Sequence, residues 1–141
     1  FHCEDDWEFY QEGFIRDSME VLMQDRTIYT VWLRHPSDRN GHPTLAGVRL
    51  TLNNVRYQDM ATNYRGKWHG MTWNPGLRRL SDYQAAGAFE NFCKWSRNEH
   101  INAEIDFNQH YHKLGFKAVT LCRGFVKHIG HLNSTKRLQE K

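Results

Sequence analysis

Three consecutive carboxylates stand near the start of the chain. Glu4, Asp5 and Asp6 directly follow a short apolar segment, and Trp7 closes the run. Neighbouring carboxylates repel one another, and a divalent cation with oxygen ligands is the ordinary way to relieve that repulsion. The acid run therefore predicts a cation site, with a charged turn between a strand and a helix as the alternative.

A second group of reactive side chains lies at positions 67–80. Two tryptophans, Trp68 and Trp73, precede an Asn-Pro-Gly turn, and Arg78 and Arg79 follow it. A guanidinium group pairs with two phosphate oxygens at once, so either arginine would suit a diphosphate. Two solvated arginines at a helix start are the alternative. One tryptophan would stack on a sugar ring, and the other would pack in the core.

The first half of the chain must position these groups. Residues 1–3 read as the end of a buried strand, which would place the acids at the ligand-binding edge of an open α/β sheet. Residues 13–24 show helical periodicity, with their methionines expected in the core. Residues 27–33 predict a strand, so that strand, helix and strand form a βαβ-like unit with a parallel sheet. Residues 48–61 predict a hairpin around an Asn-Asn turn, and 67–73 predict an aromatic strand.

The second half of the chain predicts two helices and two short strands. Residues 82–95 read as a helix weakened at Gly87, and residues 101–114 read as another that Gly115 ends. Residues 117–121 and 125–129 then predict strands. Together these elements predict an α/β fold, with a mixed sheet flanked by helices.

The order of the motifs resembles glycosyltransferases of the GT-A fold, of the family 2-like, EDD/DxD type. The resemblance rests on EDDWEF at 4–9, NPGLRR at 74–79, the helix that contains Glu104, and HIGH at 128–131, and it covers nearly the whole chain. It implies a partial GT-A, Rossmann-like fold that lacks the N-terminal nucleotide-binding strands. Residues 1–141 would then be a single domain, the C-terminal part of a catalytic domain cut from something longer.

The resemblance also implies a metal site. Asp6 would ligate Mn²⁺ or Mg²⁺, with Glu4 as a further ligand, and the metal would hold the diphosphate of a nucleotide-sugar. Asp5 would contact the ribose or the metal shell. A histidine of the HIGH segment, either His128 or His131, would complete the site, since imidazole and carboxylate ligands coexist at Mn²⁺.

The remaining roles concern the donor and the chemistry. Arg78, Arg79 and Trp73 would contact the donor. Related enzymes carry two adjacent acids where this chain has Glu104 and, two positions on, Asp106, so the general base is one of these two. Such a base is needed because a hydroxyl is a poor nucleophile at neutral pH. The implied reaction transfers a sugar to a carbohydrate or other hydroxyl acceptor, with inversion because no nucleophile is evident.

Composition limits the partners and the compartment. The net charge of +3 is spread over many residues, which allows an anionic small molecule but falls short of the basic stripe of a nucleic-acid binder. Three isolated cysteines without a CxxC pair favour a reducing compartment, on the cytoplasmic side rather than secreted. No apolar run approaches the length of a transmembrane segment.

Two other functions fit the same residues. One is a metal-dependent phosphoester hydrolase or nuclease built from the acid run, Glu104 and some of the nine histidines. The other is a noncatalytic module whose tryptophan-rich surface binds carbohydrate or a protein. Under the glycosyltransferase reading, a preceding domain or a second chain completes the nucleotide site, and this chain alone binds nucleotide poorly.

Overall fold

The computed structural model describes residues 1–87, 91 and 100–130. Within them lie helices α1 (Phe14–Gln24), α2 (Leu80–Ala86) and α3 (His100–Lys113). The strands are β1 (Trp7–Phe9), β2 (Ile28–Trp32), β3 (Arg49–Leu50), β4 (Arg56–Asp59), β5 (Gly76–Arg78), β6 (Lys117–Leu121) and β7 (Val126–His128).

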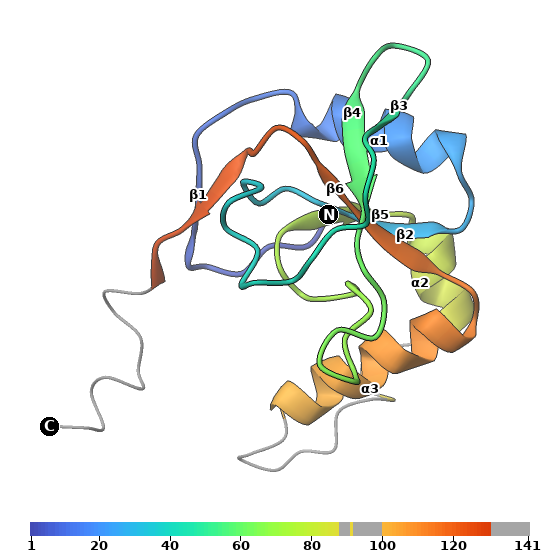
Figure 1. Ribbon diagram of the computed structural model, residues 1–141. Coiled ribbons are helices and arrows are strands. Elements are labelled where there is room, and N and C mark those ends of the chain that lie inside the picture. Colours follow the sequence, from blue (N-terminus) through green and yellow to red (C-terminus); the bar gives the residue numbers. More distant parts are fainter. Residues whose placement is uncertain (88–90, 92–99, 131–141) are drawn as a thin grey trace, which may run out of the picture.

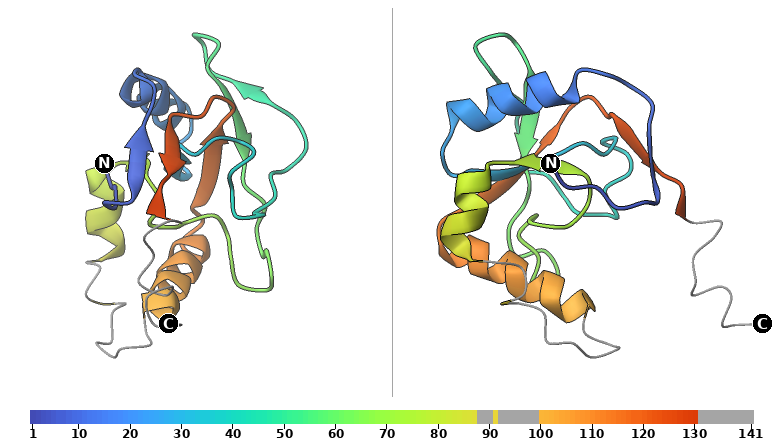
Figure 2. Two further views of the ribbon diagram at one scale, coloured as in Figure 1. Left: turned by 90° about the vertical axis from the view of Figure 1, so that its left-hand side faces the viewer. Right: turned by 180° about the vertical axis from the view of Figure 1, so that it is seen from behind.

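The main sheet is mixed and has five strands in the order β3-β4-β6-β2-β5. Its central strands β2 and β6 are parallel, and the other neighbouring pairs are antiparallel. A separate two-stranded sheet pairs β1 with β7, which lie side by side beyond one end of the main sheet (Figures 1 and 2). The predicted α/β fold with a mixed sheet and flanking helices is therefore confirmed.

Two apolar clusters fill the space on the two faces of the sheet. In the first, Val21 and Leu22 of α1 pack on Ile28 and Val31 of β2. In the second, Phe107 and Tyr111 of α3 pack on other residues of the same strand, Tyr29 and Trp32. Helices α1 and α3 accordingly lie on opposite sides of the strands (Figure 1). All five residues of β2 are buried because the strand is covered on both faces.

The start of the chain differs from the prediction. Phe1 is 61% exposed, and residues 1–3 contribute only an isolated bridge from His2 to Gly76 of β5. The strand nearest the acids, β1, follows them and pairs with β7, so the predicted βαβ unit with its parallel pair is wrong. The places on either side of β2 are taken by β5 and β6, whose side chains complete the two apolar clusters.

Most other predicted elements are confirmed within a few residues. These are α1, β2, the β3-β4 hairpin, α3, β6 and β7. The methionines of α1 were wrongly placed in the core, since Met19 is 48% and Met23 70% exposed while Val21 and Leu22 are buried. The helix predicted at 82–95 is described only as α2, and its part beyond Gly87 lies outside the described residues except at position 91.

None of the helices in the described part of the chain has the length and apolar character that crossing a membrane requires.

Arg79 ties α1, β2 and α2 together. Its guanidinium donates to the carbonyl oxygens of Leu22, of Asp25 at 2.9 Å and of Ile28 at 2.8 Å. It also forms an ion pair with Asp82 at 2.6 Å, and its side chain is only 13% exposed. The carbonyls at the end of a helix lack intrahelical partners, and a cation there also opposes the helix dipole favourably. The contacts of Arg79 therefore serve the fold.

Replacing Arg79 is expected to destabilise the protein. Arg79→Gln should lower the free energy of unfolding by about 2–3 kcal/mol, because buried carbonyls and the Asp82 carboxylate lose their partner. Urea unfolding followed by tryptophan fluorescence measures the loss. The control Arg26→Gln changes an exposed arginine in the turn after α1 and should shift the value by less than about 0.5 kcal/mol. Equal stability of the Arg79→Gln variant and the wild type would contradict this assignment.

Candidate functional site

The β1-β7 ladder brings the acid run to the HIGH segment. Trp7 is paired with His128, and the Ile129 amide donates to the Asp6 carbonyl at 2.9 Å. This register places Nε2 of His128 2.8 Å from Oδ2 of Asp6, although 122 positions separate the two residues. Two side chains that the sequence named as metal ligands therefore meet at one point.

The surroundings of this pair include an unpaired carboxylate oxygen and a closely packed glycine. Asp6 Oδ1 is buried and has no hydrogen-bond partner among the described residues. Gly130 lies against the pair, and a Cβ atom there would come within 2.7 Å of Asp6 Oδ2 and 3.1 Å of His128 Nε2. A side chain at this position would collide with the pair, so glycine allows the backbone to pack closely against Asp6 and His128. An unsatisfied carboxylate oxygen next to an imidazole is a donor set that fits Mn²⁺ or Mg²⁺.

Trp7 packs against the histidine of this pair. Its ring lies 4.8 Å from the His128 ring and is itself covered by the Arg34 guanidinium, 4.8 Å from the indole centroid. Arg34 is only 1% exposed, donates to Asn74 and forms a 2.7 Å ion pair with Asp38. A buried cation against an indole face is a favourable and well-defined contact. Arg34 thus links the acid run to the Asn-Pro-Gly turn.

The other two acids of the run lie differently. Glu4 accepts a long hydrogen bond of 3.5 Å from the Trp7 indole. Desolvation raises the pKa of Glu4, and the negative charges of Asp6 and Glu104 raise it further. The Glu4 carboxyl group therefore lies within the electrostatic influence of Asp6 and of Glu104 on α3. Asp5 is exposed, and no hydrogen bond or ion pair joins its side chain to another described residue.

Glu104 of α3 is held in place through one oxygen. Its Oε1 accepts hydrogen bonds from the Thr72 hydroxyl and, at 3.0 Å, from the Trp73 amide. No hydrogen bond from the described residues reaches Oε2, which is therefore available to accept a proton. Asp106 is exposed and lies two positions further along the helix, which puts it on the opposite side. The geometry favours Glu104 over Asp106 as the base.

Asn108, one turn after Glu104, explains why residues 67–73 do not form the predicted strand. Its buried amide accepts from the backbone of His69 at 2.9 Å and of Met71 at 3.1 Å, and donates to the Lys67 carbonyl at 2.6 Å. One side chain thus satisfies three backbone groups that a neighbouring strand would otherwise have to pair. The segment is an irregular loop fixed to α3.

A cavity of about 410 Å³ gathers three of the four residues predicted to bind the donor, and Asp5 does not line it. Glu4, Trp73 and Arg78 line it, together with Phe1, His2, Arg79, Leu80, Tyr83 and Phe107. Arg78 is half-buried, donates to the Thr72 carbonyl and lies 5.5 Å above the Tyr29 ring. Burial lowers the pKa of Arg78, because its positive charge is poorly solvated by water. Arg79 touches the same cavity but commits its guanidinium to the fold.

A second cavity, of about 260 Å³, contains Glu104. Its wall is formed by aromatic, basic and polar side chains: Trp32, Arg39, Asn40, His42, Tyr64, Arg65, Trp68, Gly70, Thr72 and Asn74. Residues 72–74 separate the two cavities, because Trp73 lines the first while Thr72 and Asn74 line the second. Each of the two tryptophans, Trp68 and Trp73, therefore lines a cavity, and neither belongs to the buried core.

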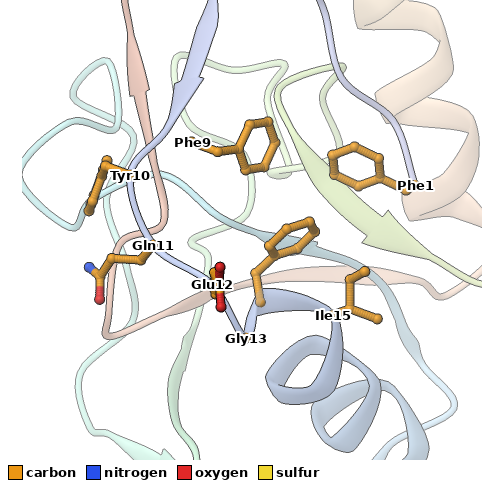
Figure 3. Close-up of a pocket in the computed structure, with 8 residues that line it drawn as sticks. Phe1, Phe9, Tyr10, Gln11, Glu12, Gly13 and Ile15 are labelled. Carbon is orange, nitrogen blue, oxygen red and sulfur yellow. The ribbon is translucent and has the colours of Figure 1, made fainter.

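A third cavity shares Phe1 with the first. It has a volume of about 660 Å³ and is formed by residues around the turn before α1, among them Phe1, Phe9, Tyr10 and Ile15 (Figure 3). Its walls are mainly apolar and aromatic, and none of the predicted site residues belongs to it.

Sequence reasoning missed several residues that build the site. Arg34, Thr72, Asn108 and Gly130 all contact predicted residues or their supporting loop. An arginine that directly follows an otherwise apolar strand was an available signal for Arg34, since buried charges need partners. His131 lies outside the described residues, and within the described part of the chain no three His, Cys, Asp or Glu side chains form a ready metal cluster.

Comparisons with models of protein families, with curated proteins and with solved structures find no match to this chain. The account of its function therefore rests on the residues and their geometry.

Proposed function

We propose that this chain is the catalytic portion of a metal-dependent glycosyltransferase of the GT-A type, which transfers a sugar from a nucleotide-sugar to an acceptor hydroxyl. The observation that carries the proposal is the convergence of Asp6 and His128 at 2.8 Å. Glu4 of the same acid run lines the 410 Å³ cavity, and Trp73 of that cavity donates to Glu104. In fold terms, we assign the mixed sheet to the part of a GT-A domain that follows the metal motif.

Asp6 and His128 would hold Mn²⁺ or Mg²⁺. These ions are commonly bound by one or two protein ligands together with phosphate oxygens of the substrate, so a pair of protein ligands is a sufficient anchor. The bound ion would neutralise charge on the departing nucleoside diphosphate. Trp7 and Arg34 fix the imidazole and the acid run relative to each other, which preserves the spacing of the two ligands.

The 410 Å³ cavity would receive the sugar-diphosphate part of the donor. Arg78 supplies a positive charge in a partly desolvated position, where it stabilises developing negative charge more strongly than in water. Trp73 presents a half-buried indole to the same cavity, suited to stacking on a sugar ring. Glu4 and Asp5 directly precede Asp6 in the sequence, and we assign them to the metal shell or the ribose.

Glu104 is the proposed general base. The Thr72 hydroxyl and the Trp73 amide hold its Oε1, so that Oε2 has a fixed direction from which to take the acceptor's proton. Trp73 also lines the 410 Å³ cavity, so this one residue connects the base to the proposed donor site. A single anchored base supports inversion at the anomeric carbon.

Binding of inorganic pyrophosphate tests the metal site without requiring a nucleoside site. Calorimetry should show pyrophosphate binding that depends on Mn²⁺. Asp6→Asn and His128→Gln should each weaken it at least about tenfold, since even indirect supports of a metal site cost 10- to 100-fold. Glu12→Gln, an exposed change of the same charge in the turn before α1, should leave the affinity unchanged. Equal affinity without Mn²⁺, or in all three variants, would rule out this metal site.

The base is tested by turnover. Release of nucleoside diphosphate should be followed with the best donor of a nucleotide-sugar panel. Glu104→Gln should lower kcat by about 10² to 10⁴-fold, because general base catalysis contributes that much. Its amide oxygen can still accept from Thr72 and Trp73, so Mn²⁺-dependent pyrophosphate binding should persist. Asp106→Asn is the matched control and should retain kcat. The reverse ranking of the two variants would transfer the role to Asp106, and hydrolysis of simple phosphoesters would favour a hydrolase instead.

A further inference from the structure

The 260 Å³ cavity around Glu104 combines two kinds of side chain that suit a charged sugar. Tyr64 and Trp68 give it aromatic surface, and Arg39 and Arg65 give it positive charge. Aromatic rings can cover the apolar face of a sugar, and guanidinium groups form paired hydrogen bonds with a carboxylate or phosphate. The cavity is separate from the donor cavity but adjoins it at residues 72–74.

Arg39 lines this cavity and has one donor without a partner. Its Nη1 is buried and has no hydrogen-bond partner among the described residues. Arg79, which supports the fold, has acceptors at both terminal nitrogens, whereas Arg34 pairs with Asp38 but, like Arg39, has a buried nitrogen, its Nε, that has no partner among the described residues. A buried guanidinium nitrogen without an acceptor is costly, and an anionic ligand would remove that cost.

Arg65 is presented by a rigid turn. The backbone of Tyr64 and Trp68 is joined by reciprocal hydrogen bonds of 2.7 and 2.9 Å, and Arg65 between them has a φ of 51°. Its guanidinium lies 5.1 Å from the Tyr64 ring centroid and forms no ion pair with the described residues. This contact keeps an exposed charge next to the aromatic wall rather than extended into water.

The charges of the cavity do not cancel. Two guanidinium groups face one carboxylate, that of Glu104. His42 adds no charge near neutral pH, because desolvation lowers its pKa and its Nε2 is engaged with the Ala61 carbonyl at 2.8 Å. The wall therefore carries a positive excess even with the base ionised. An anion placed by the arginines would also meet less repulsion from Glu104.

We infer that this cavity binds the acceptor, and that the acceptor is a saccharide with an anionic substituent, either the carboxylate of a uronic acid or a phosphate ester. Tyr64 and Trp68 contact the sugar, while Arg39 and Arg65 bind the anion and direct a hydroxyl toward Glu104. This inference rests on the proposed function, because it takes Glu104 as the base.

Binding of matched sugars tests the inference. The probes are methyl β-glucuronide, methyl β-glucoside and glucose 6-phosphate, titrated calorimetrically into the wild-type chain with and without Mn²⁺ and pyrophosphate. At least one anionic sugar should bind about tenfold or more tightly than the neutral glucoside, as expected of hydrogen bonds to a charged group. The tighter of the two anionic probes identifies the carboxylate or the phosphate as the preferred group.

Arginine variants provide the specific control. Arg39→Gln and Arg65→Gln should each reduce the preference for the anionic sugar at least about threefold, with affinity for the neutral glucoside unchanged. Arg56→Gln removes the same charge from an exposed position of β4 outside the cavity and should keep the full preference. Thermal unfolding of each variant verifies that the fold is retained, and Arg65, being exposed, can be replaced without disturbing the interior.

Equal binding of neutral and anionic sugars, or an unchanged preference in both cavity variants, would overturn the inference. Pyrophosphate binding on the same samples separates the two claims. If Mn²⁺-dependent pyrophosphate binding is present but the preference for anionic sugars is absent, the acceptor inference alone fails. If the arginine-dependent preference is present without metal-dependent pyrophosphate binding, the cavity is a binding site for acidic saccharides and the glycosyltransferase proposal fails.

Discussion

The pairing of β1 with β7 is the constraint on which the candidate site depends. Both strands have three residues, yet their register alone brings Asp6 and His128 to within 2.8 Å from opposite ends of the chain. Such short strands have little stability by themselves. The buried Trp7, which contacts both the Arg34 guanidinium and the His128 ring, supplies the packing that holds the ladder together.

Helix α3 provides the second half of the arrangement. Along one side it packs Phe107 and Tyr111 into the core, and along the adjacent side it fixes the loop at 67–74 through Glu104 and Asn108. Glu104, which we propose as the base, and Asn108, which shapes the loop, are therefore one helical turn apart. Glu104 lines the 260 Å³ cavity, and its hydrogen bond from Trp73 connects it to the wall of the 410 Å³ cavity.

The sequence allowed the regular elements to be predicted, because their apolar periodicity is strong. It also named Asp6 and His128, which the fold brings together, and Glu104, which the fold anchors to residues 72 and 73. It could not reveal that residues 1–3 are not a buried strand, or that Arg79 belongs to the fold, since both depend on which segments become neighbours. The loop at 67–73 has the composition of a strand. Only the buried amide of Asn108, distant in sequence, explains why it needs no partner strand.

The most direct test of the central claim is an anomalous-difference map from a crystal of this protein grown with Mn²⁺ and pyrophosphate. The account predicts a manganese peak bonded to both Asp6 and His128, with pyrophosphate oxygens completing its coordination shell. The direct hydrogen bond between the two side chains would then be replaced by metal bonds. A map in which Mn²⁺ binds elsewhere, with the Asp6–His128 hydrogen bond intact, would contradict the account.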